Sequence, residues 1–149
     1  MPLEFEELQG DLFSSPDPTD ALAHCVSEDL HMGKGIAVPF KELFGQVDHL
    51  RSQRCGPGQV AYLTVPDTDP PRRIFYMITK RRYYDKPTRV DFTSSLRDLR
   101  RLCEELGVTT LAIPRIGSGL DRLPKAWVDR QIRDVFEGWD GRIRMYYLE

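Results

Sequence analysis

The stretch Ile113-Pro114-Arg115-Ile116-Gly117-Ser118-Gly119-Leu120-Asp121 joins an apolar run to a turn with two spaced glycines and ends on a carboxylate. Gly117 and Gly119 permit positive φ and close backbone approach, so successive N–H groups can converge on an anion. In open α/β sheets, ligands bind beyond the carboxyl ends of the strands. The stretch therefore predicts an α/β fold with a phosphate-binding turn, and it places Asp121 at the rim as a candidate acid/base.

Segments typical of strands alternate with segments typical of helices along the rest of the chain. Apolar and β-branched runs predict strands at 3–8, 21–26, 60–65, 74–79, 109–114 and 143–148. Apolar residues spaced three or four apart predict helices over 36–44, 47–54, 91–106 and 124–136. The alternation predicts one layered α/β domain over residues 1–149, with a mixed sheet covered by helices on both faces.

Several residues indicate where these helices begin and end. Asp91 or Thr93 can cap the helix that carries Leu106 near its end, and Gly107 suits the position just after it. Pro124 suits the first position of the last helix. Pro39 fits the first predicted helix only within its first turn.

The bulk composition bounds the class of protein. The chain has 149 residues of which 40% are hydrophobic, so one core that buries roughly 70% of the unfolded surface is expected. It holds 21 lysines and arginines against 23 aspartates and glutamates, for a formal net charge of −2. This balance argues against a generally basic nucleic-acid binder but allows one local basic patch.

Cysteine usage and the N-terminal residues bear on the compartment. Cys25, Cys55 and Cys103 are an odd number without a CxxC pair, which suggests reduced, mostly buried thiols and no metal site. The acidic first residues do not fit a signal peptide, and no apolar run approaches the ~20 residues of a membrane span. We expect an intracellular, cytoplasmic monomer without a membrane partner, or a nuclear one if the cell is eukaryotic.

Four polar segments follow or interrupt the apolar runs: Gly10-Asp11, residues 27–29 with 32–35, Thr79-Lys80 and residues 117–121. If the strands lie side by side, the ends of these strands can line one crevice. None of these segments alone identifies a binding site, but their order along the chain does.

Five sequence blocks resemble the macrodomains: residues 10–13, 23–29, 32–38, 78–80 with 86–88, and 114–121. Within that family the chain is most similar to the terminal ADP-ribose protein glycohydrolases, the O-acetyl-ADP-ribose deacetylase type. The resemblance implies a three-layer α/β/α macrodomain that binds ADP-ribose. It further implies hydrolysis of ADP-ribose from glutamate and aspartate side chains of modified proteins, and of O-acetyl-ADP-ribose, without metal or cofactor.

The resemblance also implies roles for single residues. Lys80 occupies the position of a lysine that attacks the anomeric carbon of the distal ribose, and Asp121 that of an aspartate that assists and resolves the adduct. Asp11 matches the aspartate that recognises adenine. The other predicted ligand contacts are Leu12, Ser27, Gly33, Gly35, Ile36, Ile116, Gly117, Ser118, Gly119 and Leu120.

Elementary chemistry agrees with these roles. A lysine attacks a sugar carbon only as its neutral amine, which burial or nearby cations such as Arg81 and Arg82 favour. Asp121 could take the proton and later activate water. Amides of residues 117–120, and those at a helix start near residues 33–36, can hold a diphosphate, and the hydroxyl of Ser27 could contact the distal ribose.

Simpler interpretations remain open for the same residues. Taken alone, Lys80 could be a solvated charge at a strand end, and Asp121 could cap a helix. Asp11 could be a turn residue, and the glycines of the 117–119 turn could serve only its backbone conformation. His24 lies in an apolar run, where a core histidine with satisfied hydrogen bonds is expected.

Two other functions also remain open. One is an ADP-ribose reader without turnover, which needs neither Lys80 nor Asp121. The other is hydrolysis of ADP-ribosylated DNA or RNA, for which the segment Arg81-Arg82-Tyr83-Tyr84 offers charge and aromatic rings. The same segment could be no more than a solvated loop.

Overall fold

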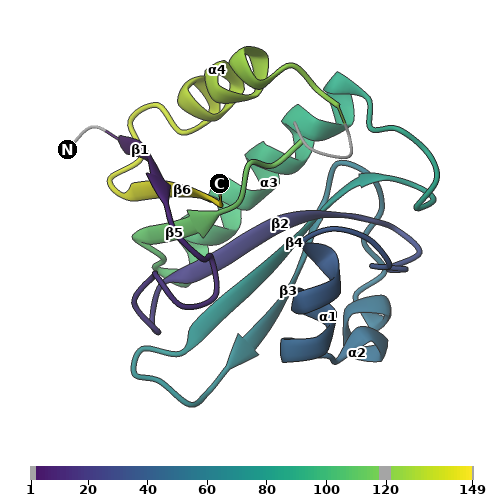
Figure 1. The fold of residues 1–149 in the computed structure, drawn as a ribbon, viewed down its shortest axis with the longest axis horizontal. Helices are drawn as coiled ribbons and strands as arrows, with labels where there is room; N and C mark the ends of the chain where they lie inside the picture. Colours follow the sequence, from purple (N-terminus) through teal and green to yellow (C-terminus); the bar gives the residue numbers. More distant parts are fainter. Residues whose placement is uncertain (1–2, 118–121, 149) are drawn as a thin grey trace.

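The computed structural model describes residues 3–117 and 122–148, and in them two helices cover each face of a six-stranded sheet (Figure 1). α3 and α4 lie on one face, and α1 and α2 on the other. The predicted three-layer α/β/α class is confirmed. The elements in chain order are β1 Glu4–Gln9, β2 Ala21–Ser27, α1 Ala37–Phe44, α2 Val47–Ser52, β3 Val60–Val65, β4 Arg72–Lys80, α3 Arg89–Leu106, β5 Thr110–Ile113, α4 Lys125–Val135 and β6 Arg142–Tyr147.

The sheet is mixed, with strand order β1-β6-β5-β2-β4-β3. Each neighbouring pair is parallel except β3 and β4, which are antiparallel. The carboxyl ends of β2, β4 and β5 therefore meet at one edge of the sheet, where β3 begins. None of the helices in the described ranges is long and apolar enough to span a bilayer.

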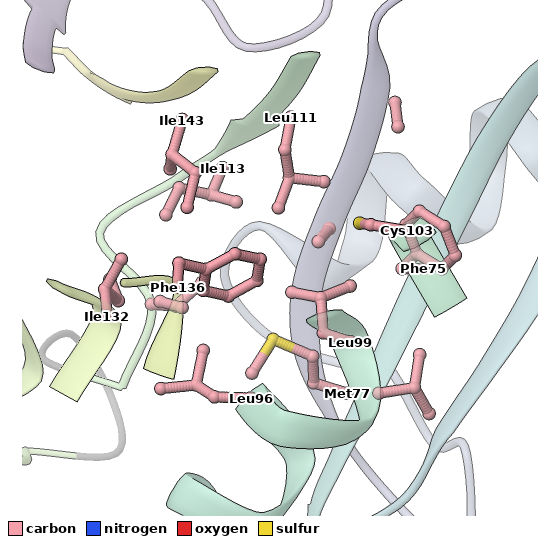
Figure 2. Close-up of a cluster of buried hydrophobic side chains, with 14 of the residues drawn as sticks. Phe75, Met77, Leu96, Leu99, Cys103, Leu111, Ile113, Ile132, Phe136 and Ile143 are labelled. Atoms are coloured by element: carbon pink, nitrogen blue, oxygen red, sulfur yellow. The ribbon is translucent and has the colours of Figure 1, made fainter. Parts of the chain in front are cut away.

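The sheet separates two apolar cores because its central strands are buried on both faces. In β4, Phe75 and Met77 point to the α3 and α4 side, where Figure 2 shows Met77 beside Leu96 and Leu99 of α3 and Phe75 beside Cys103. The intervening Tyr76 packs on the α1 side. Burying each large apolar side chain contributes about 1.5–3 kcal/mol, so a slip of one residue in this register would be costly.

The helix ends correct two predictions. α3 is capped by Thr88 and not by Asp91 or Thr93, because Thr88 has extended dihedrals and its hydroxyl accepts a hydrogen bond from the Asp91 amide at 3.1 Å. Pro124 has ψ 126° and so precedes α4 instead of opening it. Gly107 follows α3 with φ 70°, as predicted, and Pro39 is the third residue of α1.

His24 lies in the core, but its hydrogen bonds are not satisfied. Its ring stacks on Phe40 with centroids 3.6 Å apart and meets the ring of Tyr76 edge-on. Within the described residues, neither ring nitrogen has a hydrogen-bond partner. Because burial disfavours the charged ring, the pKa of His24 falls to about 3.

We predict that His24 makes stability depend on pH. With a folded pKa below the unfolded value of 6.5, the unfolded chain takes up the proton first, so stability is lost as pH falls from 6.5 toward 3. Denaturant unfolding at pH 6.5 and 5 should show a loss of about 1.5 kcal/mol that His24→Leu removes. The exposed His49→Gln should keep the wild-type loss. An equal loss in His24→Leu would refute this assignment.

Candidate active site

The pairing of β2 with β4 is irregular at the shared carboxyl edge. It is regular up to Val26, which faces Ile78. The register then shifts so that Ser27 lies opposite Lys80, and Thr79 is left as the extra residue. The amide after Ser27 donates to the Lys80 carbonyl at 2.8 Å, which secures the shifted register. Irregular pairing of this kind re-aims side chains and is frequent beside active sites.

A cavity of about 590 Å³ opens beyond these strand ends, within the size range of small-molecule sites. It lies where the carboxyl ends of β2, β4 and β5 meet. Seven residues predicted from the sequence line it together: Ser27, Gly33, Gly35, Ile36, Lys80, Ile116 and Gly117.

Other predicted residues lie elsewhere. Asp11 and Leu12 are not among the lining residues of the cavity. The Asp11 carboxylate accepts a hydrogen bond from the Phe13 amide at 2.8 Å, and Leu12 is buried in the core on the α1 side. The adenine role of Asp11 and the ligand contact of Leu12 stay predictions. Ser118, Gly119, Leu120 and Asp121 lie outside the described residues.

The loop between β2 and α1 forms one wall of the cavity. Leu30 and Met32 have φ of 54° and 48°, a conformation that side chains rarely adopt, and both are buried. Their burial anchors the unusual backbone. The loop ends at Ile36 and Ala37, where α1 begins without a side-chain cap. The Val38 amide donates to the Gly35 carbonyl at 3.2 Å and Pro39 has no amide hydrogen, so the amides that can favour an anion at this helix start are those of Ile36 and Ala37.

Gly117 forms the opposite wall under two constraints. Its φ is 73°, and a Cβ atom there would lie 2.9 Å from Phe92 Cε1. Its carbonyl accepts a hydrogen bond from the Leu123 amide at 2.7 Å. Only glycine meets both constraints, so the predicted need for glycine at this position is explained by packing as well as by φ.

Asp29 links the loop after β2 to the loop after β4, both of which contribute lining residues to the cavity. The sequence analysis placed Asp29 in a polar segment of the expected crevice but gave it no role of its own. Its carboxylate accepts hydrogen bonds from the Ser27 hydroxyl, from the His31 amide at 3.2 Å and from the Tyr83 amide at 3.0 Å. Burial alone would raise the pKa of Asp29, but these donors outweigh it and hold the pKa below its usual value. The polar turn after β2 was the only signal of this role.

The aromatic segment after β4 also reaches the cavity. The rings of His31 and Tyr83 stack with centroids 4.0 Å apart, and both line the cavity with Tyr84. Tyr84 is 63% exposed, and its hydroxyl accepts a hydrogen bond from the Arg82 guanidinium at 2.8 Å. The segment is thus a wall of the site, and His31 is a lining residue that the sequence analysis missed.

The chain is similar to known proteins over most of its length. A family model described as Macro domain matches residues 23–132. A Homo sapiens protein named ADP-ribose glycohydrolase OARD1 is 47% identical over 141 residues, which cover 95% of this chain and 90% of that protein. A Thermus aquaticus protein named DNA ADP-ribosyl glycohydrolase is 32% identical over 140 residues, covering 90% of this chain and 38% of the relative.

Solved structures share the fold. The macrodomain of Thermus aquaticus DarG superimposes with a TM-score of 0.84 at 25% identity, covering 97% of this chain and 99% of that one. Thermosipho africanus DarTG, solved in complex with ADP-ribose, gives a TM-score of 0.82 at 21% identity over 96% of this chain and 41% of its own. At 21% identity, the similarity to the Thermosipho africanus structure shows a shared fold only.

We predict that Asp29→Asn loosens the two loops without unfolding the chain. An uncharged amide oxygen accepts the Tyr83 and His31 amides more weakly, so the Tyr83 amide should exchange its hydrogen about tenfold faster. Hydrogen exchange read by NMR measures this rate. Asp67→Asn, at an exposed position, should leave the rate unchanged. Unaltered exchange at Tyr83 in Asp29→Asn would show that the carboxylate does not hold the loop.

Proposed function

The chain belongs to the macro domain family, and we propose that it is a glycohydrolase that removes ADP-ribose from modified glutamate and aspartate side chains. One observation carries this proposal. The register shift sets Lys80 beside Ser27 at the cavity, in a chain 47% identical to a named ADP-ribose glycohydrolase.

The walls of the cavity supply the contacts that ADP-ribose would need. The amides where α1 begins, near Gly35 and Ile36, and the turn at Gly117 would hold the diphosphate. The distal ribose would then lie near Ser27 and Lys80. This orientation points the scissile bond toward the end of β4.

In the proposed reaction, Lys80 attacks the anomeric carbon of the distal ribose as a neutral amine. The bond from that carbon to the acceptor oxygen breaks, and the acceptor leaves as a carboxylate. Asp121 takes the proton from the attacking nitrogen. The ribose ring then opens to an imine between the anomeric carbon and the Lys80 nitrogen, and Asp121 gives its proton to the ring oxygen. Water, activated by the Asp121 carboxylate, adds to the imine carbon, and the carbon–nitrogen bond breaks to release ADP-ribose and Lys80. O-acetyl-ADP-ribose would enter the same cavity, since its acetyl group is also a carboxylate ester of the distal ribose.

A second candidate is hydrolysis of ADP-ribosylated nucleic acid. The Thermus aquaticus relative is named for a DNA substrate, and two exposed tyrosines lie beside the cavity with Arg81 and Arg82 before them in the chain. Exposed rings can stack on bases while arginines neutralise phosphates. The exposed tyrosines and the two arginines are the observation that favours a nucleic-acid substrate as the second candidate.

We predict that Lys80→Ala and Asp121→Ala each lower the rate on a peptide with ADP-ribosylated glutamate by at least about 100-fold, because each removes a group that acts in the reaction. Product release read by mass spectrometry measures the rate, and calorimetry should show that ADP-ribose still binds. Arg97→Ala, on the exposed face of α3, should retain full activity. Full activity in Lys80→Ala or Asp121→Ala would contradict the mechanism. If the wild type binds ADP-ribose tightly but releases no product from the peptide, the chain is an ADP-ribose reader without turnover.

The nucleic-acid candidate makes a separate prediction. If ADP-ribosylated single strands are substrates, the double variant Arg81→Gln, Arg82→Gln should bind them more weakly. The slope of log affinity against log salt should become shallower by about 1.4, since two phosphate contacts are lost. Fluorescence anisotropy at several salt concentrations measures this slope. An unchanged slope speaks against nucleic acid as the substrate.

A further inference from the structure

Glu7, on the edge strand β1, links two parts of the chain that stand on either side of Asp121 in the sequence. Its carboxylate accepts a hydrogen bond from the Arg115 guanidinium at 2.6 Å and another from the Lys125 ammonium at 2.7 Å, with one oxygen for each. Arg115 follows β5 and lines the cavity, and Lys125 is the first residue of α4. One side chain of β1 therefore holds both ends of the segment 115–125, which carries the proposed acid/base.

The alternation of side chains along β1 sets Glu7 apart from its neighbour Glu6. Phe5 packs on the core that contains α3 and α4, and Glu7, two residues further along the strand, lies on the same face. Glu6 points to the opposite face, where it pairs with Arg144 of the neighbouring β6 at 3.1 Å. The Glu6 pair stays within two adjacent strands, whereas Glu7 reaches the turn after β5 and the start of α4.

The Arg115 side chain crosses β6 to reach Glu7, because β6 lies between β5 and β1 in the sheet. Its guanidinium lies over the ring of Tyr147, the last residue of β6, with 4.2 Å from Cζ to the ring centroid. The face of the ring attracts the cation and limits the positions that the guanidinium can take. A carboxylate and a ring thus fix the residue that precedes the glycine turn.

Asp129 completes the other end of the link. The Lys125 ammonium also pairs with the Asp129 carboxylate at 2.8 Å, one turn further along α4. Cations and carboxylates therefore alternate through one network, in the order Arg115, Glu7, Lys125 and Asp129. An isolated ion pair at the surface contributes little, but a network of several charges holds its geometry better.

A backbone hydrogen bond closes the same segment inside these ion pairs. The Leu123 amide donates to the Gly117 carbonyl at 2.7 Å. Only the five residues 118–122 stand between these two in the sequence, and Asp121 is one of them. Holding the ends of a short segment together removes much of its conformational freedom. The outer ion pairs and the inner hydrogen bond therefore restrict the same segment.

We propose that Glu7 is a positioning residue for the reaction. By holding both ends of the segment 115–125, it fixes where Asp121 stands relative to Lys80. The inference rests on the proposed function and deepens it. Asp121 must come within hydrogen-bond reach of the attacking nitrogen to take its proton, and a small misplacement of such a group lowers the rate of the reaction. Glu7 acts through its two cationic partners and is not among the residues that line the cavity.

Turnover of a peptide with ADP-ribosylated glutamate tests this role. Glu7→Gln keeps the shape of the side chain but removes its charge, so kcat should fall about fivefold. Calorimetry should show a change of less than about twofold in the affinity for ADP-ribose, since Glu7 does not line the cavity. Glu6→Gln also removes one ion-paired carboxylate from β1 and should keep the wild-type kcat. An unchanged kcat in Glu7→Gln, or an equal fall in Glu6→Gln, would overturn the proposal.

Ionic strength and a second variant show whether Glu7 acts through its charge and through Lys125. The side chains of Glu7 and Lys125 are 28% and 37% exposed, so dissolved salt can screen the pair. Between about 0.05 and 0.5 M salt, the wild-type kcat should fall toward that of Glu7→Gln, whose own kcat should stay level. Lys125→Met should also lower kcat, and the double variant should be no slower than Glu7→Gln alone. Additive losses, or one salt dependence shared by Glu7→Gln and the wild type, would contradict the proposed link.

Hydrogen exchange at the Leu123 amide tests the link without turnover. Its rate should rise about fivefold in Glu7→Gln and stay unchanged in Glu6→Gln. A wild type that turns over no conjugate would overturn the proposed function. In that case faster exchange at Leu123 would still support Glu7 as the residue that holds the two ends of the segment, and unchanged exchange would refute it.

Discussion

The shift in pairing between β2 and β4 is the constraint on which the whole site depends. A regular register would set Thr79, and not Lys80, opposite Ser27. The shift brings Lys80 beside Ser27 at the cavity and leaves the buried Thr79 hydroxyl without a hydrogen-bond partner among residues 3–117 and 122–148. One backbone irregularity thus places the proposed nucleophile at the cavity.

The layers keep this irregularity in place. β4 is buried on both faces, so the alternation of Phe75 and Met77 with Tyr76 fixes which side each residue faces. With the strand fixed, only its end is free to depart from regular pairing. The surrounding loops are tied to that end by Asp29, whose carboxylate links the turn after β2 to the loop after β4. The cavity is therefore bounded by loops but positioned by the sheet.

Much of the fold followed from local patterns, because apolar runs, helical spacing and Gly107 each act within a few residues. The family likeness named seven residues that the structure brings to one cavity. The register shift was not predictable, since it depends on two strands about fifty residues apart. For the same reason the sequence analysis missed Asp29 as a link between loops and expected His24 to have hydrogen-bond partners. Thr88 was missed as a cap because Asp91 and Thr93 fit the same local pattern.

The central claim is that Lys80 forms a covalent bond to the distal ribose. Borohydride added during turnover of a peptide with ADP-ribosylated glutamate would reduce an imine to a stable amine, and mass spectrometry of the digested protein would locate it. The account predicts an ADP-ribose adduct on the peptide that contains Lys80 and none in Lys80→Ala. Turnover without any adduct, or an adduct on another residue, would contradict it.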